Sequence, residues 1–301
     1  MLCPGCKKKG FAKFLEKTGQ YNLFICNACA LTFCEPMQPA TGNFYELKAQ
    51  YEDKWEFGFI CQKMQQLGLS GELLDIGCGD GIFMEMASKQ FAVAGIDINM
   101  GALKAAKLKR NLNDTYPITL KEHINMFPAK KYDIITAFHI LEHVGEPAEF
   151  ITDIKHSLKP QGIAVISIPN PNRWTLRWVR EAWDYPPHHL TRWTTYGLCA
   201  LLESRGLNVL EVFYERISFL SQIRDAMRDI IWSVVFKKFS FKVASRINLS
   251  KERFVLWPFL VNIKGKVIKL LAFSLALITY PVFRLGNFTG KSLLVLAKPK
   301  D

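Results

Sequence analysis

The stretch "LLDIGCGDGIF", residues 73–83, places an acid just before three closely spaced glycines. An apolar run ends in Asp75, and Gly77, Gly79 and Gly81 follow before a helical pattern begins. Glycine is needed where the backbone turns tightly and must let a ligand approach without a Cβ in the way. Asp97, 20 residues after Gly77, follows the next apolar run, where its carboxylate can accept both ribose hydroxyls of an adenosine. This combination predicts a nucleoside-cofactor site rather than a purely structural turn.

Two cysteine pairs form a second group of chemically capable residues. "CPGC" (residues 3–6) and "CNAC" (residues 26–29) are separated by 19 residues. Tetrahedral zinc needs four soft ligands, and two CxxC knuckles at this distance are typical of a zinc ribbon. The spacing therefore predicts a structural zinc site with the ligands Cys3, Cys6, Cys26 and Cys29. Such a site is closed and leaves no coordination position for a substrate.

The elements that must position the glycine loop alternate between two kinds of pattern. Short apolar runs at residues 72–77, 91–98, 132–139 and 163–169 are separated by helical stretches. This alternation at βαβ spacing predicts an α/β protein with a doubly wound parallel sheet. Two further strand candidates, 207–214 and 292–297, lie near the end of the chain.

The glycine loop reads DxGxGxG, whereas a dinucleotide fingerprint reads GxGxxG. In this respect the chain resembles the class I S-adenosylmethionine-dependent methyltransferases. The resemblance continues through "YDIITAFHILEHV", "LKPQGIAVISIPNPN" and "PPHHLTRWT", and it covers about residues 70–216 and 290–298. It implies a Rossmann-like seven-stranded sheet whose last two strands pair antiparallel, with an insertion between them.

The resemblance also implies a set of cofactor-binding residues. Asp75 and the loop would line the methionine part of S-adenosylmethionine, and Asp97 would hold the ribose. The full expected set is Asp75, Gly77, Cys78, Gly79, Gly81, Asp97, Ile98, Phe138 and His139. The chain departs from the family at the adenine end of the third strand, where an Asp is usual. Here Glu122, His123 and Asn125 are present instead.

Methyl transfer to a hydroxyl requires alignment of the acceptor with the methyl carbon and a group that takes the proton. Histidine suits this task near neutral pH. Two prolines stiffen the chain before His188 and His189, and His189 matches a histidine that often precedes a helix in the resembled family. We expect His189 as the general base, with His139 and His188 as further candidates. His143 is expected to cap or pack a helix.

Two other patterns leave alternatives open. Glu142 beside His143 could bind a divalent metal, as a similar pair does in some quinone methyltransferases. The run "NRWTLRWVREAWDY" (172–185) is either an amphipathic helix packed on the sheet or a substrate lid that offers arginines and aromatic rings.

The net charge of +12 is concentrated in one segment. Fourteen Lys or Arg stand against three acids between residues 216 and 291, among many apolar residues that include "LAFSLALITYPVFRLG" (271–286). The uncharged part is too short for the roughly 30 Å hydrocarbon core of a bilayer. We expect helices that lie in an anionic membrane interface, or a hydrophobic lid or dimer surface.

These patterns divide the chain into a zinc ribbon (1–40), a methyltransferase domain (41–216 and 288–301) and a basic, apolar helical insertion (217–287). The N-terminus has no apolar run typical of a secretory signal, which favours the cytoplasm, peripheral to the inner face of the membrane.

The leading function is methylation, most simply O-methylation, of a small-molecule, sugar or lipid-linked glycan acceptor. A nucleic-acid methyltransferase is the first alternative, but the Asn/Asp-Pro-Pro-aromatic motif of base methylation does not follow the fourth strand. Nucleic acid is therefore not the expected partner. A non-catalytic cofactor-binding scaffold is the second alternative, and the intact glycine loop and Asp97 speak against it. Oligomeric state is left open.

Overall fold

The structure is a computed structural model that describes residues 1–39, 54–173, 184–216 and 290–300. Almost all of these residues belong to one compact unit. The insertion 217–287 and most of the aromatic run 172–185 lie outside the described residues, so their predicted roles stay predictions, as do the domain boundaries. None of the helices in the described ranges is long and apolar enough to cross a membrane.

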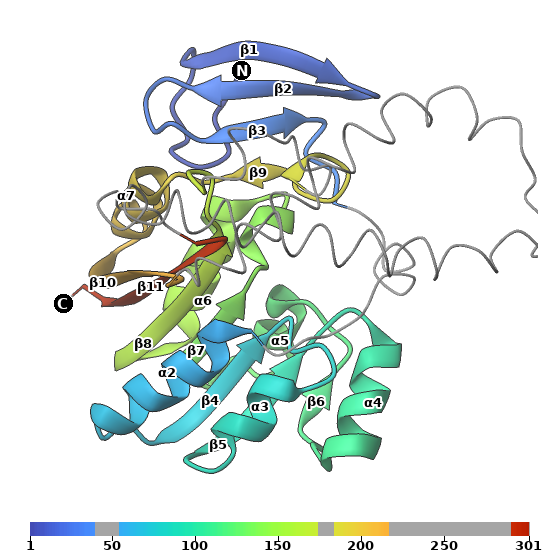
Figure 1. Cartoon of the computed structure of the whole chain (residues 1–301), viewed down its shortest axis with the longest axis vertical. Helices are drawn as coiled ribbons and strands as arrows, with labels where there is room; N and C mark the ends of the chain where they lie inside the picture. Colours follow the sequence, from blue (N-terminus) through green and yellow to red (C-terminus); the bar gives the residue numbers. More distant parts are fainter. Residues whose placement is uncertain (40–53, 174–183, 217–289, 301) are drawn as a thin grey trace, which may run out of the picture. The chain divides into compact units, whose positions relative to one another are not determined.

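A seven-stranded sheet forms the centre of the described structure, with the strand order β10-β11-β8-β7-β4-β5-β6 (Figure 1). The neighbours from β8 to β6 are parallel, whereas β11 pairs antiparallel with both β8 and β10. The strands are β4 (Gly71–Ile76), β5 (Phe91–Ile96), β6 (Thr115–Tyr116), β7 (Tyr132–Phe138), β8 (Leu158–Pro169), β10 (Leu207–Tyr214) and β11 (Ser292–Pro299).

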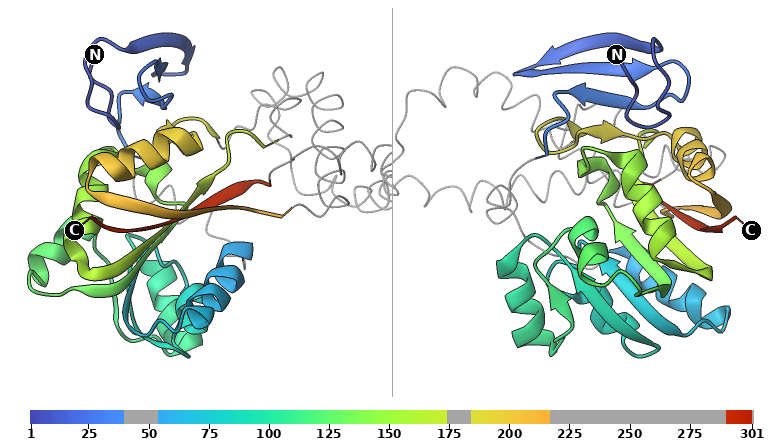
Figure 2. Two further views of the ribbon diagram at one scale, coloured as in Figure 1. Left: turned by 90° about the vertical axis from the view of Figure 1, so that its left-hand side faces the viewer. Right: turned by 180° about the vertical axis from the view of Figure 1, so that it is seen from behind.

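Consecutive residues of the central strands pack into two different cores, one on each face of the sheet. Leu73 and Leu74 on β4, like Ile134 and Ile135 on β7, point to opposite sides because side chains alternate along a strand. Helices cover both faces, as Figure 2 shows. One face packs against α2 (Trp55–Gln66) and α3 (Ile82–Ala87), with α4 (Met100–Arg110) beside α3; the other packs against α5 (Leu120–Met126), α6 (Pro147–Ser157) and α7 (Thr195–Ser204). Burial on both faces explains why the parallel strands read as continuous apolar runs.

Local sequence signals fix several of the helix starts that border the site. Asn99 caps α4 by accepting a hydrogen bond from the Ala102 amide at 3.1 Å. Thr119 and Glu122 form a reciprocal capping box at the start of α5. Thr194 caps α7, as its sequence position predicts.

The N-terminal region forms a separate four-stranded antiparallel sheet in the order β1-β2-β3-β9. Its first three strands are β1 (Ala12–Thr18), β2 (Tyr21–Cys26) and β3 (Thr32–Glu35). The fourth, β9 (Thr191–Arg192), comes from a distant part of the chain and follows the two adjacent histidines directly (Figure 1). No pattern in the sequence indicates this two-residue strand.

The α/β fold with a seven-stranded sheet is confirmed. The last two strands pair antiparallel, as expected, with Leu207 opposite Pro299 and Tyr214 opposite Leu293.

We predict that Ile166→Ala lowers the free energy of unfolding by about 2–5 kcal/mol, the usual cost of this truncation in a core. Ile166 is 1% exposed on the central strand β8. Leu108→Ala, at a residue 75% exposed on α4, is the control and should change stability by less than about 0.5 kcal/mol. Urea titration of the two variants measures the difference, and equal losses would contradict the assigned core.

Candidate active site

The glycine loop lies at the carboxyl end of β4. Gly77, Gly79 and Gly81 have φ angles of 72°, 56° and 81°, a left-handed backbone that residues with a Cβ adopt at a cost. A Cβ on Gly77 would also collide with the side chain of Ile140. The loop therefore needs glycine at this position for both its conformation and its close packing.

Asp97 joins the glycine loop to the end of β5. Its Oδ2 accepts a hydrogen bond from the Gly79 amide at 2.8 Å, and its Oδ1 accepts one from the Asn99 amide at 2.7 Å. Burial raises the pKa of Asp97, although these two hydrogen bonds act in the opposite direction. Each carboxylate oxygen keeps a second lone pair. The carboxylate is thus fixed in place and can accept two hydroxyl groups from a ligand.

Asp75 is the more deeply buried acid of the loop, with 2% of its surface exposed. The hydroxyl of Thr136 on β7 donates to Asp75 Oδ1 at 2.6 Å. Burial raises the pKa of Asp75 to about 7 despite this hydrogen bond. A carboxylate of this kind gains when a positively charged ligand group reaches it.

A group of buried charges lies beyond the end of β7. His139 occupies a left-handed backbone conformation, with φ of 56°. Its Nε2 lies 3.0 Å from Glu56 on α2, and its Nδ1 lies 3.5 Å from Glu142. Burial disfavours the imidazolium, but the attraction of the Glu142 and Glu56 carboxylates outweighs burial, and the pKa of His139 is raised. Both ring nitrogens of His139 therefore face carboxylates.

Glu142, in the short 3₁₀ helix η1 (Leu141–His143), is 1% exposed. Neither of its carboxylate oxygens has a hydrogen bond to any residue that the structure describes. Besides His139, the Nε2 atoms of His143 and His189 lie 4.0 Å and 3.9 Å from its Oε1. Burial alone would raise the pKa of Glu142, but the histidines outweigh it and the pKa is lowered. The carboxylate is held ionised and can accept a hydrogen bond from a ligand.

The two adjacent histidines are brought to the same place by a different segment. His189 is 8% exposed, and its Nδ1 lies 3.4 Å from Asp184 Oδ1. His143 Nδ1 lies 2.6 Å from the carbonyl oxygen of His188 and can donate a hydrogen bond to it. One ring nitrogen from each of His143, His188 and His189 lies within 4.8 Å of the others, close enough to share a metal ion.

One cavity of about 1000 Å³ connects the glycine loop to the histidines. This volume is at the upper end of the ~300–1000 Å³ typical of ligand sites and leaves room for a second molecule beside a nucleoside. The expected residues that line it are Asp75, Gly77, Cys78, Asp97, Ile98, Phe138, His139, His188 and His189. Gly79 and Gly81 are not among the lining residues; Gly79 contributes its amide to Asp97, and Gly81 packs near Leu112.

Sequence reasoning missed two residues of the cavity region. Lys54 lines the cavity, and burial lowers its pKa although Glu56, Glu142 and Asp75 act against this shift. Glu56 is 1% exposed on the face of α2 that also buries Phe57. The sequence signal that could have identified Glu56 is its charge, because it lies among the apolar residues of an amphipathic helix.

The residues weighed for the adenine end do not line the cavity. Glu122 belongs to the capping box of α5, and the ring of His123 is buried beside Tyr132, with its Nε2 3.2 Å from the tyrosine hydroxyl. Ile118, Thr119 and Leu120 line that part of the cavity instead.

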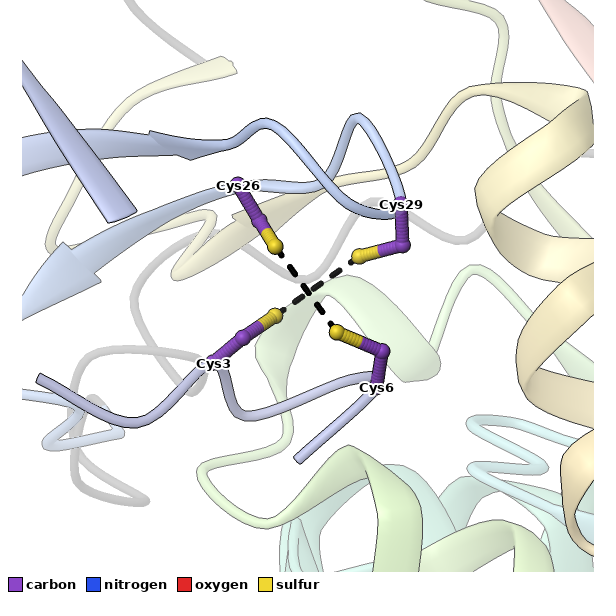
Figure 3. A group of neighbouring side chains, drawn as sticks. All are labelled: Cys3, Cys6, Cys26 and Cys29. Atoms are coloured by element: carbon purple, nitrogen blue, oxygen red, sulfur yellow. Dashed lines mark hydrogen bonds between the residues drawn. The ribbon is translucent and has the colours of Figure 1, made fainter. Parts of the chain in front are cut away.

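The four predicted metal-binding cysteines converge from two loops of the N-terminal sheet (Figure 3). The Sγ atoms of Cys3 and Cys29 are 3.6 Å apart, and those of Cys6 and Cys26 are 3.7 Å apart. A tetrahedral zinc ion with Zn–S bonds of about 2.3 Å requires sulfur atoms about 3.8 Å apart. The donor set and its spacing fit such an ion.

Residues 53–212 match the family model described as "Methyltransferase domain". Among curated proteins, the chain is 39% identical over 131 residues to a "Ubiquinone biosynthesis O-methyltransferase" of Psychrobacter arcticus, covering 40% of this chain and 51% of that protein. A protein of the same description from a Bradyrhizobium species is 30% identical over 176 residues, covering 52% of this chain and 68% of that protein. The chain spans about half the length of the first of these relatives.

Solved structures with the same fold include a SAM-dependent methyltransferase from Archaeoglobus fulgidus. It has a TM-score of 0.50 and 16% identity, and the match covers 86% of this chain and 100% of that one. The [4+2]-cyclase SpnF matches with a TM-score of 0.51 and 17% identity, and the match covers 87% of this chain and 98% of that one. Similarities at this identity establish the fold alone.

Asp75→Asn should make the stability of the ligand-free protein less dependent on pH. The pKa of Asp75 is raised on folding to about 7 from its ordinary value of 3.8, so ionisation of this group opposes folding. The contribution of Asp75 to the free energy of unfolding is therefore fully present below about pH 4 and is lost as the pH rises through about 7. The uncharged isostere removes this loss, which is on the order of 4 kcal/mol at most. Urea titrations of both proteins from pH 4 to 8 measure it; parallel curves would contradict the burial of an ionisable Asp75.

Proposed function

The chain belongs to the methyltransferase domain family, and from this membership we propose that it is an S-adenosylmethionine-dependent methyltransferase that methylates a hydroxyl of a small-molecule, sugar or lipid-linked acceptor. The observation that carries the proposal is the position of Asp97, which the Gly79 and Asn99 amides fix at one end of a cavity with room for two molecules. S-adenosylmethionine, when bound, supplies a methyl group already activated by its sulfonium.

The cofactor end of the cavity offers a complementary group for each polar part of that molecule. Asp97 would accept the ribose hydroxyls, and Asp75 would face the amino group of the methionine part. Lys54 would face the methionine carboxylate, because it lines the cavity and interacts electrostatically with Asp75, and an anion offsets the cost of its burial. The proposal assigns the other expected residues to the cofactor end as well: Gly77, Gly79, Gly81, Cys78, Ile98, Phe138 and His139.

The acceptor end offers a base. His189 Nδ1, with its proton directed at Asp184, leaves a lone pair on Nε2. His189 Nε2 would take the proton of the acceptor hydroxyl while the hydroxyl oxygen bonds to the methyl carbon of the cofactor. Buried Glu142 stabilises the resulting imidazolium, since its Oε1 lies 3.9 Å from His189 Nε2. His139 is less suited to this role, because its carboxylate neighbours raise its pKa and favour the protonated ring, which has no lone pair for a proton.

The class of acceptor is proposed from two observations of different kinds. The relatives named above carry the description "Ubiquinone biosynthesis O-methyltransferase", which favours an apolar or lipid-linked acceptor with a ring hydroxyl. The basic, apolar segment 217–287 is suited to an anionic membrane surface. The proposed location is therefore the cytoplasm, at the inner face of the membrane.

The N-terminal sheet is proposed to hold one structural zinc ion on Cys3, Cys6, Cys26 and Cys29. The sulfur spacing and the burial of three of these residues support a closed site with no open position.

Asp97→Ala should weaken S-adenosylmethionine binding by at least about 100-fold, because two hydrogen bonds to a charged group are lost at about 1.5–3 kcal/mol each. Titration calorimetry with the purified chain measures this affinity. Glu211→Ala removes an acid that pairs with Lys63 outside the cavity and should bind as the wild type does. Wild-type affinity in Asp97→Ala would contradict the assigned site.

The acceptor is tested with methyl-labelled S-adenosylmethionine and extracts of membrane lipids, glycan intermediates and RNA. Label in the lipid or glycan fraction, lost in His189→Ala, is the expected result. Label in RNA would favour the nucleic-acid alternative, and binding without transfer to any fraction would favour a scaffold.

Elemental analysis of the purified chain should find one zinc ion per chain. Cys26→Ser should lose it, whereas Cys61→Ser, which changes a cysteine on α2, should retain it. A metal content that does not depend on Cys26 would contradict the four-cysteine site.

A further inference from the structure

The segment that carries the proposed base is also the fourth strand of the N-terminal sheet. Strand β9 lies beside β3 (Figure 1). Thr191 is opposite Phe33, and Arg192 is opposite Thr32. The Cys34 amide donates to the Leu190 carbonyl at 3.0 Å and extends this pairing by one residue toward the histidines. The sheet whose loops carry the four cysteines is therefore hydrogen-bonded to Leu190, the residue that follows His189.

The opposite side of the same segment is bonded to the cavity wall. The Leu190 amide donates to the Glu142 carbonyl at 2.9 Å, and the His188 carbonyl lies 2.6 Å from His143 Nδ1. Leu190 is thus bonded through its carbonyl to the N-terminal sheet and through its amide to the residue whose carboxylate faces the histidines. A displacement of β3 would act directly on this link.

The metal-binding knuckles themselves contact the residues that follow β9. Trp193 is 1% exposed, and a Cβ on Gly5, inside the first knuckle, would lie 2.9 Å from its ring. A Cβ on Gly197 of α7 would lie 2.7 Å from the Cys29 carbonyl oxygen of the second knuckle. Both knuckles therefore pack without space against the chain on the C-terminal side of the histidines.

The cofactor loop is held by other means. The Gly77 and Cys78 amides both donate to the Ile96 carbonyl, and Asp97 accepts from the loop and from α4. These bonds lie within β4, β5 and the loops that follow them, and none of them involves the N-terminal sheet. The hydrogen bonds that hold the cofactor loop therefore do not depend on the N-terminal sheet.

We propose that the N-terminal sheet is a positioning element for His188 and His189, so that the metal-bound state of the four cysteines determines the geometry of the acceptor end while the cofactor end is left intact. Metal binding to such knuckles is coupled to their folding. Loss of the metal would release β3, and β9 would lose its pairing partner. The inference rests on the proposed function for the role of the histidines, but the coupling itself concerns only the described contacts.

The first test removes the metal from the full-length chain by chelation and follows two quantities. Backbone hydrogen exchange should rise at least tenfold at residues 188–193, and diethyl pyrocarbonate should modify His188 and His189 at least tenfold faster. The affinity for S-adenosylhomocysteine, measured by calorimetry, should change less than threefold. A segment that stays protected without metal overturns the proposal. The proposal is also overturned if the affinity for S-adenosylhomocysteine falls together with the protection of residues 188–193, because the N-terminal sheet would then support the whole domain.

The second test uses a variant that keeps all four cysteine ligands. Cys34→Pro removes the amide that donates to Leu190 and should reproduce the exposure of the two histidines with the metal still bound. Leu15→Pro is the matched control, because Leu15 is 47% exposed at the bulge in the edge strand β1, where proline is tolerated. Equal modification of the histidines in both variants would overturn the proposal.

The readouts separate this inference from the proposed function. A wild-type chain that binds no S-adenosylhomocysteine would refute the proposed cofactor, whereas exchange and histidine modification would still report on the link between the metal and residues 188–193.

Discussion

Glu142 imposes the strongest physical constraint on this structure, because its carboxylate is almost completely buried and lacks a hydrogen bond from the described residues. An ionised group in such a position is costly unless opposite charge lies near it. The compensation comes from histidines on two segments, His139 and His143 beside it and His189 from more than forty residues further along the chain. The histidine end of the cavity can form only when the fold brings these segments together.

The fold meets this requirement at the carboxyl edge of the parallel sheet. Strands β4, β5 and β7 all end there, so the glycine loop, Asp97 and His139 open into one cavity. The sheet supplies these residues from its own loops. The His188–His189 segment instead depends on the N-terminal sheet for its pairing partner. A small domain that looks like an appendage in the sequence is thereby part of the site.

The predictable part of the site was the part encoded locally. A few neighbouring residues are enough to recognise the glycine loop, Asp97 and the two CxxC pairs. Tight turns and metal-binding knuckles need particular residue types at fixed spacing. Glu56 was not predictable, since its partner His139 lies 83 residues away. The strand β9 was missed for the same reason: two residues carry no periodicity, and their strand exists only because β3 lies beside them. Glu122 and His123 were considered for adenine binding because their side chains are polar. In the structure Glu122 caps helix α5, and His123 packs in the core beside Tyr132.

A crystal structure of the chain with S-adenosylhomocysteine would show whether one cavity holds the nucleoside on Asp97 and directs the methyl position to the histidine end. We expect both ribose hydroxyls on the Asp97 carboxylate, the methionine part near Asp75 and Lys54, and the sulfur facing the side of His139 and His189. A nucleoside bound elsewhere, or bound with its ribose away from Asp97, would contradict this expectation.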